Sequence, residues 1–273
     1  MRLVPVPAKI NLALVVGRRR DDGLHPVANV LQRIDLCDWF GLEPGRRLSV
    51  DGYAADTIVR AALERLAAEA DVEPRWRVRL VKRIPPAAGL GGGSADAAAA
   101  LVAANATLAT PLPGKRLGVL AAEIGADVPF FLTPGPKLAT GAGERLEPLD
   151  LPQDFWVAVV LPWGGEKRST RDVYARFDDL GGGAEFEARS AALRSTLEAC
   201  TRPRHFGSLP PNDLAEAAGR PTLVDELASA GAFRADVSGA GPAVYGLFHR
   251  RDDARAALAR LSAARGWVAA AVW

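Results

Sequence analysis

A glycine-rich loop constrains this chain more than any other segment, because it joins two elements of different type. Residues 85–96 read Pro-Pro-Ala-Ala-Gly-Leu-Gly-Gly-Gly-Ser-Ala-Asp, and an alanine-rich segment follows. Apolar residues alternate with arginines over residues 75–80, which predicts a half-exposed strand before the loop, while the alanines predict a helix after it. The glycines let the backbone turn sharply and aim successive N–H groups at one anion. Because a helix N-terminus also favours negative charge, the segment predicts a phosphate-binding loop.

Two common nucleotide-binding motifs do not fit this loop. No lysine precedes Ser94, so the loop is not the P-loop of the common NTPases. Ser94 also occupies the last glycine position of Gly-x-Gly-x-x-Gly, which disfavours an NAD-dependent oxidoreductase. A flexible surface linker is the remaining alternative, but linkers rarely run straight from a strand into a strong helix. We expect Ser94 to cap that helix and Asp96 to lie in its first turn.

Composition narrows the class of protein. The 273 residues suffice for one large domain or two of ordinary size, and 49% hydrophobic with 24% charged residues describes a soluble globular protein. A net charge of +2 gives no case for a nucleic-acid partner. The two cysteines make no disulfide scaffold, the histidines have no zinc spacing, and the apolar runs are too short to span a membrane. No secretory hydrophobic region stands at the N-terminus, so we expect a cytoplasmic protein.

Hydrophobic periodicity predicts mixed secondary structure in two clusters. Strands are expected at residues 8–16, 27–36, 38–42, 48–51, 76–80, 156–161, 235–237, 243–248 and 267–273. Helices are expected at residues 57–70, from 94 onward, and at 115–124, 186–198, 221–230 and 252–265. A polar loop with a turn at Asp22-Gly23 follows the first strand. The prediction is an α+β protein with domains at 1–150 and 151–273.

Three segments together resemble the GHMP superfamily of small-molecule kinases, which includes galactokinase, homoserine kinase and mevalonate kinase. They are Pro-Ala-Lys-Ile-Asn-Leu at residues 7–12, the glycine loop at 85–95, and Ser-Gly-Ala-Gly-Pro at 238–242. Their order and spacing match the superfamily over nearly the whole chain. The resemblance implies a two-domain GHMP kinase fold. The N-terminal domain (1–150) would hold ATP and resemble the second domain of ribosomal protein S5, and the C-terminal substrate domain (151–273) would be ferredoxin-like.

Finer features resemble one branch of the superfamily, the 4-diphosphocytidyl-2-C-methyl-D-erythritol kinase family. They are Ala-Lys-Ile-Asn-Leu at 8–12, Asp-Gly-Leu-His at 22–25, Gly-Ala-Asp-Val-Pro-Phe-Phe at 125–131, Gly-Ala-Gly-Glu at 141–144 and Asn-Asp-Leu at 212–214. Each match is weak alone, but all five in sequence order are hard to obtain by chance.

This resemblance implies an ATP-dependent kinase of the non-mevalonate isoprenoid pathway that phosphorylates the 2-hydroxyl of 4-diphosphocytidyl-2-C-methyl-D-erythritol. ATP and Mg²⁺ are the expected cofactors. The motifs specify no metal ligands and no oligomeric state, although Ser94 could reach the ion. The alternatives are a homoserine-type or mevalonate-type kinase, or a non-catalytic ligand-binding relative, which the presence of Lys9 and Asp127 disfavours. The residues implied at the nucleotide are Pro85, Pro86, Ala87, Ala88, Gly89, Leu90, Gly91, Gly92, Gly93, Ser94 and Ala95, with Asp56 at the adenine.

Asp127 and Lys9 are the candidate catalytic residues. Phosphoryl transfer to an alcohol needs an acceptor for the hydroxyl proton, and a nearby carboxylate can serve. The resemblance implies that role for Asp127, whereas its position alone equally suits an aspartate that structures the turn before Pro129. For Lys9 the resemblance implies a cation that keeps Asp127 ionised and binds the transferred phosphoryl group. The alternative is an ordinary lysine at a strand edge.

Four residues are candidates for binding the substrate. Asn11 lies two residues after Lys9, on the same face of the expected strand, and can hydrogen-bond the substrate or fix the loop. The resemblance implies that His25 recognises the cytosine, whereas a lone loop histidine is otherwise usually exposed. Thr170 can line the substrate side or cap a helix. Gly239 permits close backbone approach near the active site, or forms an ordinary tight turn between strands.

Four positions depart from the family's pattern. Leu24 stands where the family has a tyrosine before the histidine, and a leucine packs but cannot stack on a base. Asp56 stands where an Asn-Leu pair is usual, and an ionised carboxylate accepts hydrogen bonds without donating them. Ala95 replaces a common serine, and residues 163–168 form an unusual loop. We therefore expect adenine recognition to differ in detail from the family's pattern.

Overall fold

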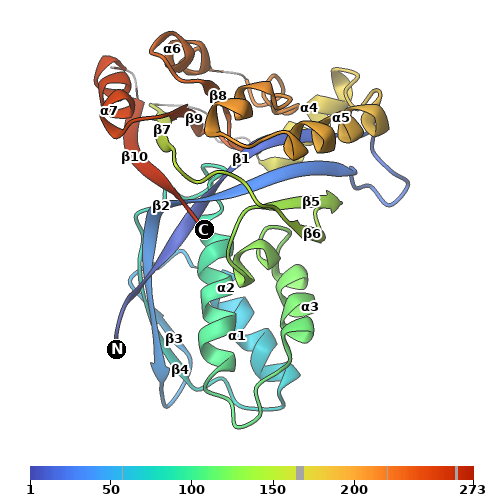
Figure 1. Cartoon of the computed structure of the whole chain (residues 1–273). Coiled ribbons are helices and arrows are strands. Elements are labelled where there is room, and N and C mark those ends of the chain that lie inside the picture. The colour runs from blue at the N-terminus through green and yellow to red at the C-terminus, as the bar shows by residue number, and fades with distance from the viewer. Residues whose placement is uncertain (57, 164–168, 220, 262–263) are drawn as a thin grey trace. The chain divides into compact units, whose positions relative to one another are not determined.

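The computed structural model describes residues 1–56, 58–163, 169–219, 221–261 and 264–273, which fall into two compact units (Figure 1). The first unit comprises Met1–Ala8, Cys37–Pro86 and Gly91–Pro134, and the second comprises Lys9–Leu36, Ala87–Leu90 and Gly135–Trp273. The chain passes from one unit to the other within β1 (Val4–Val16), within β2 (Val27–Pro44), at both ends of the segment Ala87–Leu90, and between Pro134 and Gly135. The division into domains at residue 150 stays a prediction.

The first unit packs helices against one end of β2. The C-terminal half of β2 pairs antiparallel with β4 (Trp76–Val81), and β3 (Ser49–Asp51) adds to β4 in parallel. Along β4, buried Trp76, Val78 and Leu80 alternate with exposed residues, as the sequence predicts. The helices α1 (Ile58–Glu69), α2 (Gly92–Asn105) and α3 (Gly114–Ile124) pack on one another (Figure 1). Because half of the residues of α2 are alanines, its neighbours approach closely and form one buried core with it.

The second unit is built on an antiparallel sheet. The strands β10 (Ala264–Val272), β7 (Trp156–Pro162), β9 (Val244–Phe248) and β8 (Arg234–Val237) pair in that order. The N-terminal half of β2 pairs with β10 and with β5 (Lys137–Gly141), which also pairs with β6 (Arg145–Pro148). The helices α6 (Leu223–Ser229) and α7 (Arg251–Arg260) pack on this sheet. The other helices are α4 (Thr170–Asp179) and α5 (Phe186–Glu198), and short 3₁₀ turns lie at Pro129–Leu132 (η1) and Pro203–Ser208 (η2).

Most of the expected elements are confirmed, and the errors have physical causes. The strands expected at 27–36 and 38–42 form the single strand β2, since Cys37 continues the extended backbone. The helix expected to reach residue 265 ends at Arg260, and Ala264 instead pairs with Pro162 of β7. There strand pairing overrides the helix propensity of the alanines. The elements α4, β5 and β6 were not expected.

None of the helices in the described ranges is long and apolar enough to cross a membrane. Residues 164–168 of the unusual loop before Ser169 lie outside the described residues, as does Thr57 beside Asp56.

Candidate active site

The helix that follows the glycine loop begins earlier than its sequence suggests. Gly91 is the N-cap residue with φ +70°, and Gly92 is the first residue of α2. The Ala95 N–H donates to the Gly91 carbonyl oxygen at 2.9 Å, which closes the first helical turn. The expectation that Ser94 caps the helix is therefore wrong, because the left-handed glycine turn starts the helix before Ser94. The N–H groups of the first three helical residues precede the intrahelical ladder and suit an anion.

Asp96 lies beyond the first turn of α2, contrary to expectation, because the helix begins at Gly92, and it forms a buried ion pair. It is 1% exposed, and its Oδ2 accepts a hydrogen bond from Lys82 Nζ at 2.6 Å. Lys82 also pairs with Asp38, whose Oδ1 accepts the N–H groups of Arg83 and Ile84 at 2.5 and 2.9 Å. This cluster ties the end of β4 to the start of α2. Burial raises the pKa of Asp96 to about 7, with Lys82 opposing the shift.

The first half of the glycine loop is packed against the turn at residues 238–241. Gly89 has φ +86°, and a Cβ there would lie 2.1 Å from the Ser238 carbonyl oxygen. The Ala243 N–H donates to the Ala88 carbonyl oxygen at 3.0 Å, and the Lys9 N–H donates to that of Leu90 at 2.9 Å. The missing side chain of Gly89 therefore serves the contact between two loops. The three motif segments around residues 9, 89 and 239 meet within the second unit.

Lys9 and Asn11 lie side by side and buried in this meeting point. They are 3% and 2% exposed, and Lys9 Nζ donates to Asn11 Oδ1 at 2.7 Å. Because Lys9 is buried, it is not an ordinary solvated lysine at a strand edge. A Cβ on Gly239, which has φ +61°, would lie 3.4 Å from Lys9 Nζ and 3.2 Å from Asn11 Oδ1. Gly239 thus leaves room for both side chains.

Four polar residues that carried no role in the sequence analysis support this cluster. Asn11 Nδ2 donates to Asn29 Oδ1 at 2.8 Å, and the Tyr245 hydroxyl donates to the Asn11 carbonyl oxygen at 2.8 Å. Ser238 Oγ lies within 3.0 Å of the Gly89 carbonyl oxygen and 3.2 Å of Asn11 Oδ1. Asn212 Nδ2 donates to the Gly239 carbonyl oxygen at 2.7 Å. The Ser-Gly-Ala-Gly-Pro and Asn-Asp-Leu motifs pointed to Ser238 and Asn212, whereas Asn29 and Tyr245 carried no local signal.

Asp127 is held on a turn of the first unit. The turn lies between α3 and η1, where the Val128 N–H donates to the Gly125 carbonyl oxygen at 3.0 Å. Val128 and Phe130 are fully buried and fix the turn, while Asp127 itself is half-buried. The predicted helix end at Gly125 is confirmed. A carboxylate that keeps solvent access on a fixed turn can accept a proton from a bound alcohol.

His25 is buried, contrary to the usual state of a loop histidine. Its Nε2 lies 2.8 Å from Asp178 Oδ1, and its ring centroid lies 4.8 Å from that of Tyr174. Thr170, by contrast, is exposed at the first position of α4. The cap of that helix is Ser169, which forms a capping box with Asp172, so the capping alternative for Thr170 is wrong. Sequence reasoning missed Asp178 and Tyr174 because α4 was not expected.

Asp56 caps the first turn of α1. Its carboxylate oxygens accept the N–H groups of Val59 and Arg60 at 3.3 and 3.2 Å. These bonds satisfy N–H groups in the first turn of the helix. An adenine-binding role for Asp56 would have to be shared with this capping role.

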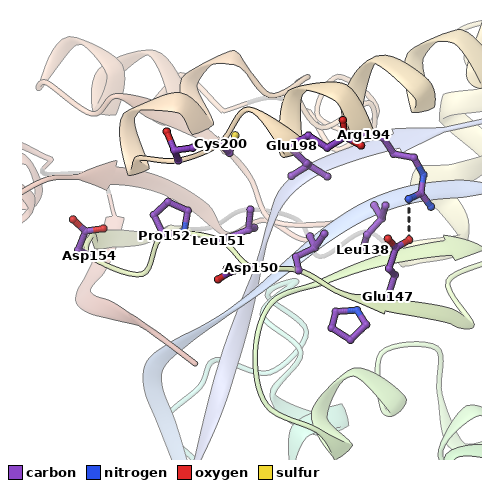
Figure 2. Close-up of a pocket in the computed structure, with 13 residues that line it drawn as sticks. Leu138, Glu147, Asp150, Leu151, Pro152, Asp154, Arg194, Glu198 and Cys200 are labelled. Atoms are coloured by element: carbon purple, nitrogen blue, oxygen red, sulfur yellow. Dashed lines mark hydrogen bonds and ion pairs between the residues drawn. The ribbon is translucent and has the colours of Figure 1, made fainter.

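A groove of about 610 Å³ in the second unit lies apart from all these residues (Figure 2). Its apolar lining includes Leu138, Leu151 and Leu197, and at its rim Arg194 Nη1 donates to Glu147 Oε2 at 2.8 Å. None of the predicted site residues lines this groove, so it offers no support for the site.

In the described ranges, no group of three or more His, Cys, Asp or Glu side chains is placed to hold a metal ion. Mg²⁺ is usually bound through substrate phosphates and few protein ligands. The helix start at residues 92–94 offers N–H groups for such phosphates and the Ser94 hydroxyl for the ion.

Comparison with known proteins identifies the family. The models of the GHMP kinase N-terminal and C-terminal domains match residues 57–135 and 221–265. The 4-diphosphocytidyl-2-C-methyl-D-erythritol kinase of Geobacter sulfurreducens is 38% identical to this chain, covering 97% of it and 96% of the relative. The chain belongs to the 4-diphosphocytidyl-2-C-methyl-D-erythritol kinase family. The Thermobifida fusca member is 40% identical over 95% of this chain and 91% of its own.

A solved structure agrees with this assignment. A crystal structure of a 4-(cytidine 5'-diphospho)-2C-methyl-D-erythritol kinase superposes on the chain with a TM-score of 0.82 at 33% identity, covering 100% of both chains. The predicted α+β fold with GHMP kinase N- and C-terminal domains is therefore confirmed.

Proposed function

We propose that this kinase transfers the γ-phosphoryl group of ATP to the 2-hydroxyl of 4-diphosphocytidyl-2-C-methyl-D-erythritol, a step of the non-mevalonate route to isoprenoid precursors. The observation that carries the proposal is the packed junction of the residue 9–11 strand, the glycine loop and the 238–241 turn. We expect the enzyme to act in the cytoplasm, where ATP is available.

The nucleotide would be held mainly by backbone groups. The N–H groups of Gly92, Gly93 and Ser94 stand ahead of the first helical hydrogen bond and favour phosphate oxygens. When bound, Mg²⁺ would neutralise the charge that builds on the transferred phosphoryl group. The hydrogen bonds among Lys82, Asp38 and Asp96 fix the start of α2, which carries these N–H groups.

Asp127 and Lys9 would divide the chemistry. Asp127 accepts the proton that leaves the substrate hydroxyl as the new P–O bond forms. Lys9 would supply a positive charge that stabilises the transferred phosphoryl group. Its hydrogen bond to Asn11 orients the lysine side chain. A buried cation is well suited to this task, because its charge is little screened by water.

The alcohol substrate would be bound from the second unit. Asn11 and Gly239 lie beside Lys9 and can contact the methylerythritol part. His25, with the Tyr174 ring beside it, would hold the cytosine. The Tyr174 ring, whose centroid lies 4.8 Å from that of His25, would supply an aromatic group beside the histidine that Leu24 cannot. Thr170, which is exposed at the start of α4, would contact the substrate from that side.

An ADP-release assay with a substrate panel tests the proposal. We expect ATP-dependent ADP release with 4-diphosphocytidyl-2-C-methyl-D-erythritol and at most background release with homoserine or mevalonate. Preference for homoserine or mevalonate would reassign the substrate. No release with any alcohol, despite measurable ATP binding, would favour a non-catalytic relative.

A further inference from the structure

The side-chain amide of Asn11 joins two neighbouring strands of the second unit. Asn11 lies on β1 and Asn29 on β2, and the two strands pair (Figure 1). Asn11 Nδ2 donates to Asn29 Oδ1 at 2.8 Å, while Lys9 Nζ donates to Asn11 Oδ1 at 2.7 Å. Lys9 and Asn11 are buried, and Asn29 is half-buried. The three side chains therefore form one series of hydrogen bonds that begins at the lysine ammonium group.

The chemistry of donors and acceptors allows this series of hydrogen bonds to run in only one direction. An ammonium group only donates, so the end of the Asn11 amide that faces Lys9 must be the carbonyl oxygen. The NH₂ end of that amide then faces Asn29, and the atom of Asn29 that it meets must be an acceptor. Asn29 supplies this acceptor with its side-chain oxygen. The oxygen of Asn29 thus fixes which way round the Asn11 amide lies.

Ser238 is the third side chain that contacts the Asn11 amide, and it cannot replace Asn29. Its Oγ lies 3.2 Å from Asn11 Oδ1 and 3.0 Å from the Gly89 carbonyl oxygen. A hydroxyl has one hydrogen, so Ser238 shares it between these two acceptors or gives it to one of them. Ser238 also meets the oxygen of the amide rather than its NH₂ group. Among the described side chains, only that of Asn29 accepts a hydrogen bond from Asn11 Nδ2.

Loss of the acceptor at position 29 would leave the NH₂ group of Asn11 buried without that partner. Asn11 is 2% exposed, so bulk water does not reach its amide to replace the lost hydrogen bond. A buried polar group without a partner is costly, and the amide lowers that cost by rotating toward another acceptor. Because the oxygen and the nitrogen belong to one rigid amide plane, the rotation withdraws Oδ1 from Lys9 Nζ. The ammonium group then loses the hydrogen bond that orients it.

We propose that Asn29 is a positioning residue for phosphoryl transfer. By accepting from Asn11 Nδ2 it holds the Asn11 amide, and through that amide the Lys9 ammonium group, in the orientation that transfer requires. This inference rests on the proposed function, because it takes Lys9 as the cation at the transferred phosphoryl group. Misplacing a catalytic group by about 1 Å costs up to about a hundredfold in rate. Because Asn29 acts only through Asn11, its loss should cost less, about tenfold in kcat.

Three substitutions separate this role from a merely structural one. Asn29→Leu keeps the size of the side chain but removes the acceptor, and it should lower kcat about tenfold while KM for ATP stays unchanged. Asn29→Asp keeps an oxygen acceptor and should keep kcat within about threefold of the wild type. Asn105→Leu is the matched control, because Asn105 is a buried asparagine whose amide bonds the backbone of Leu112. It should lower the free energy of unfolding without lowering kcat.

A double-mutant cycle with Lys9 decides whether Asn29 acts through the lysine. In Lys9→Ala no ammonium group is left to position, so adding Asn29→Leu should change kcat less than about twofold. A further tenfold loss in the double variant would overturn the inference, as would wild-type kcat in folded Asn29→Leu. If Asn29→Leu does not fold, Asn29→Ala takes its place in every comparison, with the same expected results.

Nitrogen-15 spectra of lysine-labelled protein report on the ammonium group without any substrate. The Lys9 signal, assigned from Lys9→Ala, should show hydrogen exchange with water about tenfold faster in Asn29→Leu than in the wild type, because its hydrogen bond to Asn11 is weakened. Lys82, whose Nζ donates to Asp96, is the internal control and should exchange at an unchanged rate. Equal exchange of Lys9 in the two proteins would overturn the inference. Faster exchange in Asn29→Leu, in a protein whose wild type transfers no phosphoryl group, would leave the positioning of Lys9 standing and refute the proposed reaction.

Discussion

Replacing Gly89 by alanine tests whether the glycine loop is locked against the 238–241 turn. Two costs add in Gly89→Ala. An alanine at φ +86° is strained by about 1–2 kcal/mol. Its Cβ would also lie 2.1 Å from the Ser238 carbonyl oxygen, so backbone must move, and such overpacking costs about 1–3 kcal/mol. The free energy of unfolding should therefore fall by about 2–5 kcal/mol.

Gly181→Ala isolates the first of these costs. Gly181 has φ +73°, but a Cβ there meets nothing within 4 Å, so only the backbone strain of about 1–2 kcal/mol applies. Urea denaturation followed by circular dichroism gives both values. Gly89→Ala should also lower kcat/KM for ATP, because the displaced loop carries the phosphate-binding backbone, whereas Gly181→Ala should not. Equal destabilisation of the two variants, or full activity of Gly89→Ala, would refute the locked loop.

Three further predictions concern charged and substrate-binding residues. Lys9→Ala should lower kcat at least tenfold while changing the Kd for ATP less than threefold, in stopped-flow and equilibrium binding experiments; an unchanged kcat would contradict its role at the transferred group. His25→Ala should raise KM for the cytidyl substrate about tenfold or more and spare KM for ATP, and the reverse pattern in initial-rate kinetics would remove the cytosine assignment. The buried Asp96 has a pKa raised from 3.8 to about 7, so the folded protein keeps a proton that the unfolded chain releases. The free energy of unfolding should therefore decline as pH rises from about 4 to about 7, and a decline of the same size in Asp96→Asn would assign it to other groups.

The sequence predicted most of the elements because their patterns are local. The alternation of buried and exposed side chains along β4 depends on one buried face, and six residues are enough to show it. The start of α2 was misplaced, because the left-handed conformation of Gly91 is a property of the folded loop rather than of its composition. The strand β10 was shortened, since its first residues are strand only through pairing with β7.

Short motifs predicted part of the candidate site. Residues that join the site only through contacts between distant parts of the chain were missed. Lys9, Asn11 and Gly239 were found from short motifs, and the structure brings them together. Asn29 and Asp178 lie 18 and 153 positions from the residues that they bind. Only the fold makes them neighbours. The contact of Gly89 with the 238–241 turn could not be predicted either, because that turn lies far along the chain.

Single-turnover transfer by Asp127→Asn tests the central claim most directly. Enzyme in excess would be mixed with γ-labelled ATP and the cytidyl alcohol, with ATP affinity and thermal unfolding measured on the same sample. The proposed base predicts an unchanged fold, an unchanged Kd for ATP, and a transfer rate reduced at least a hundredfold. Transfer at the wild-type rate would contradict it.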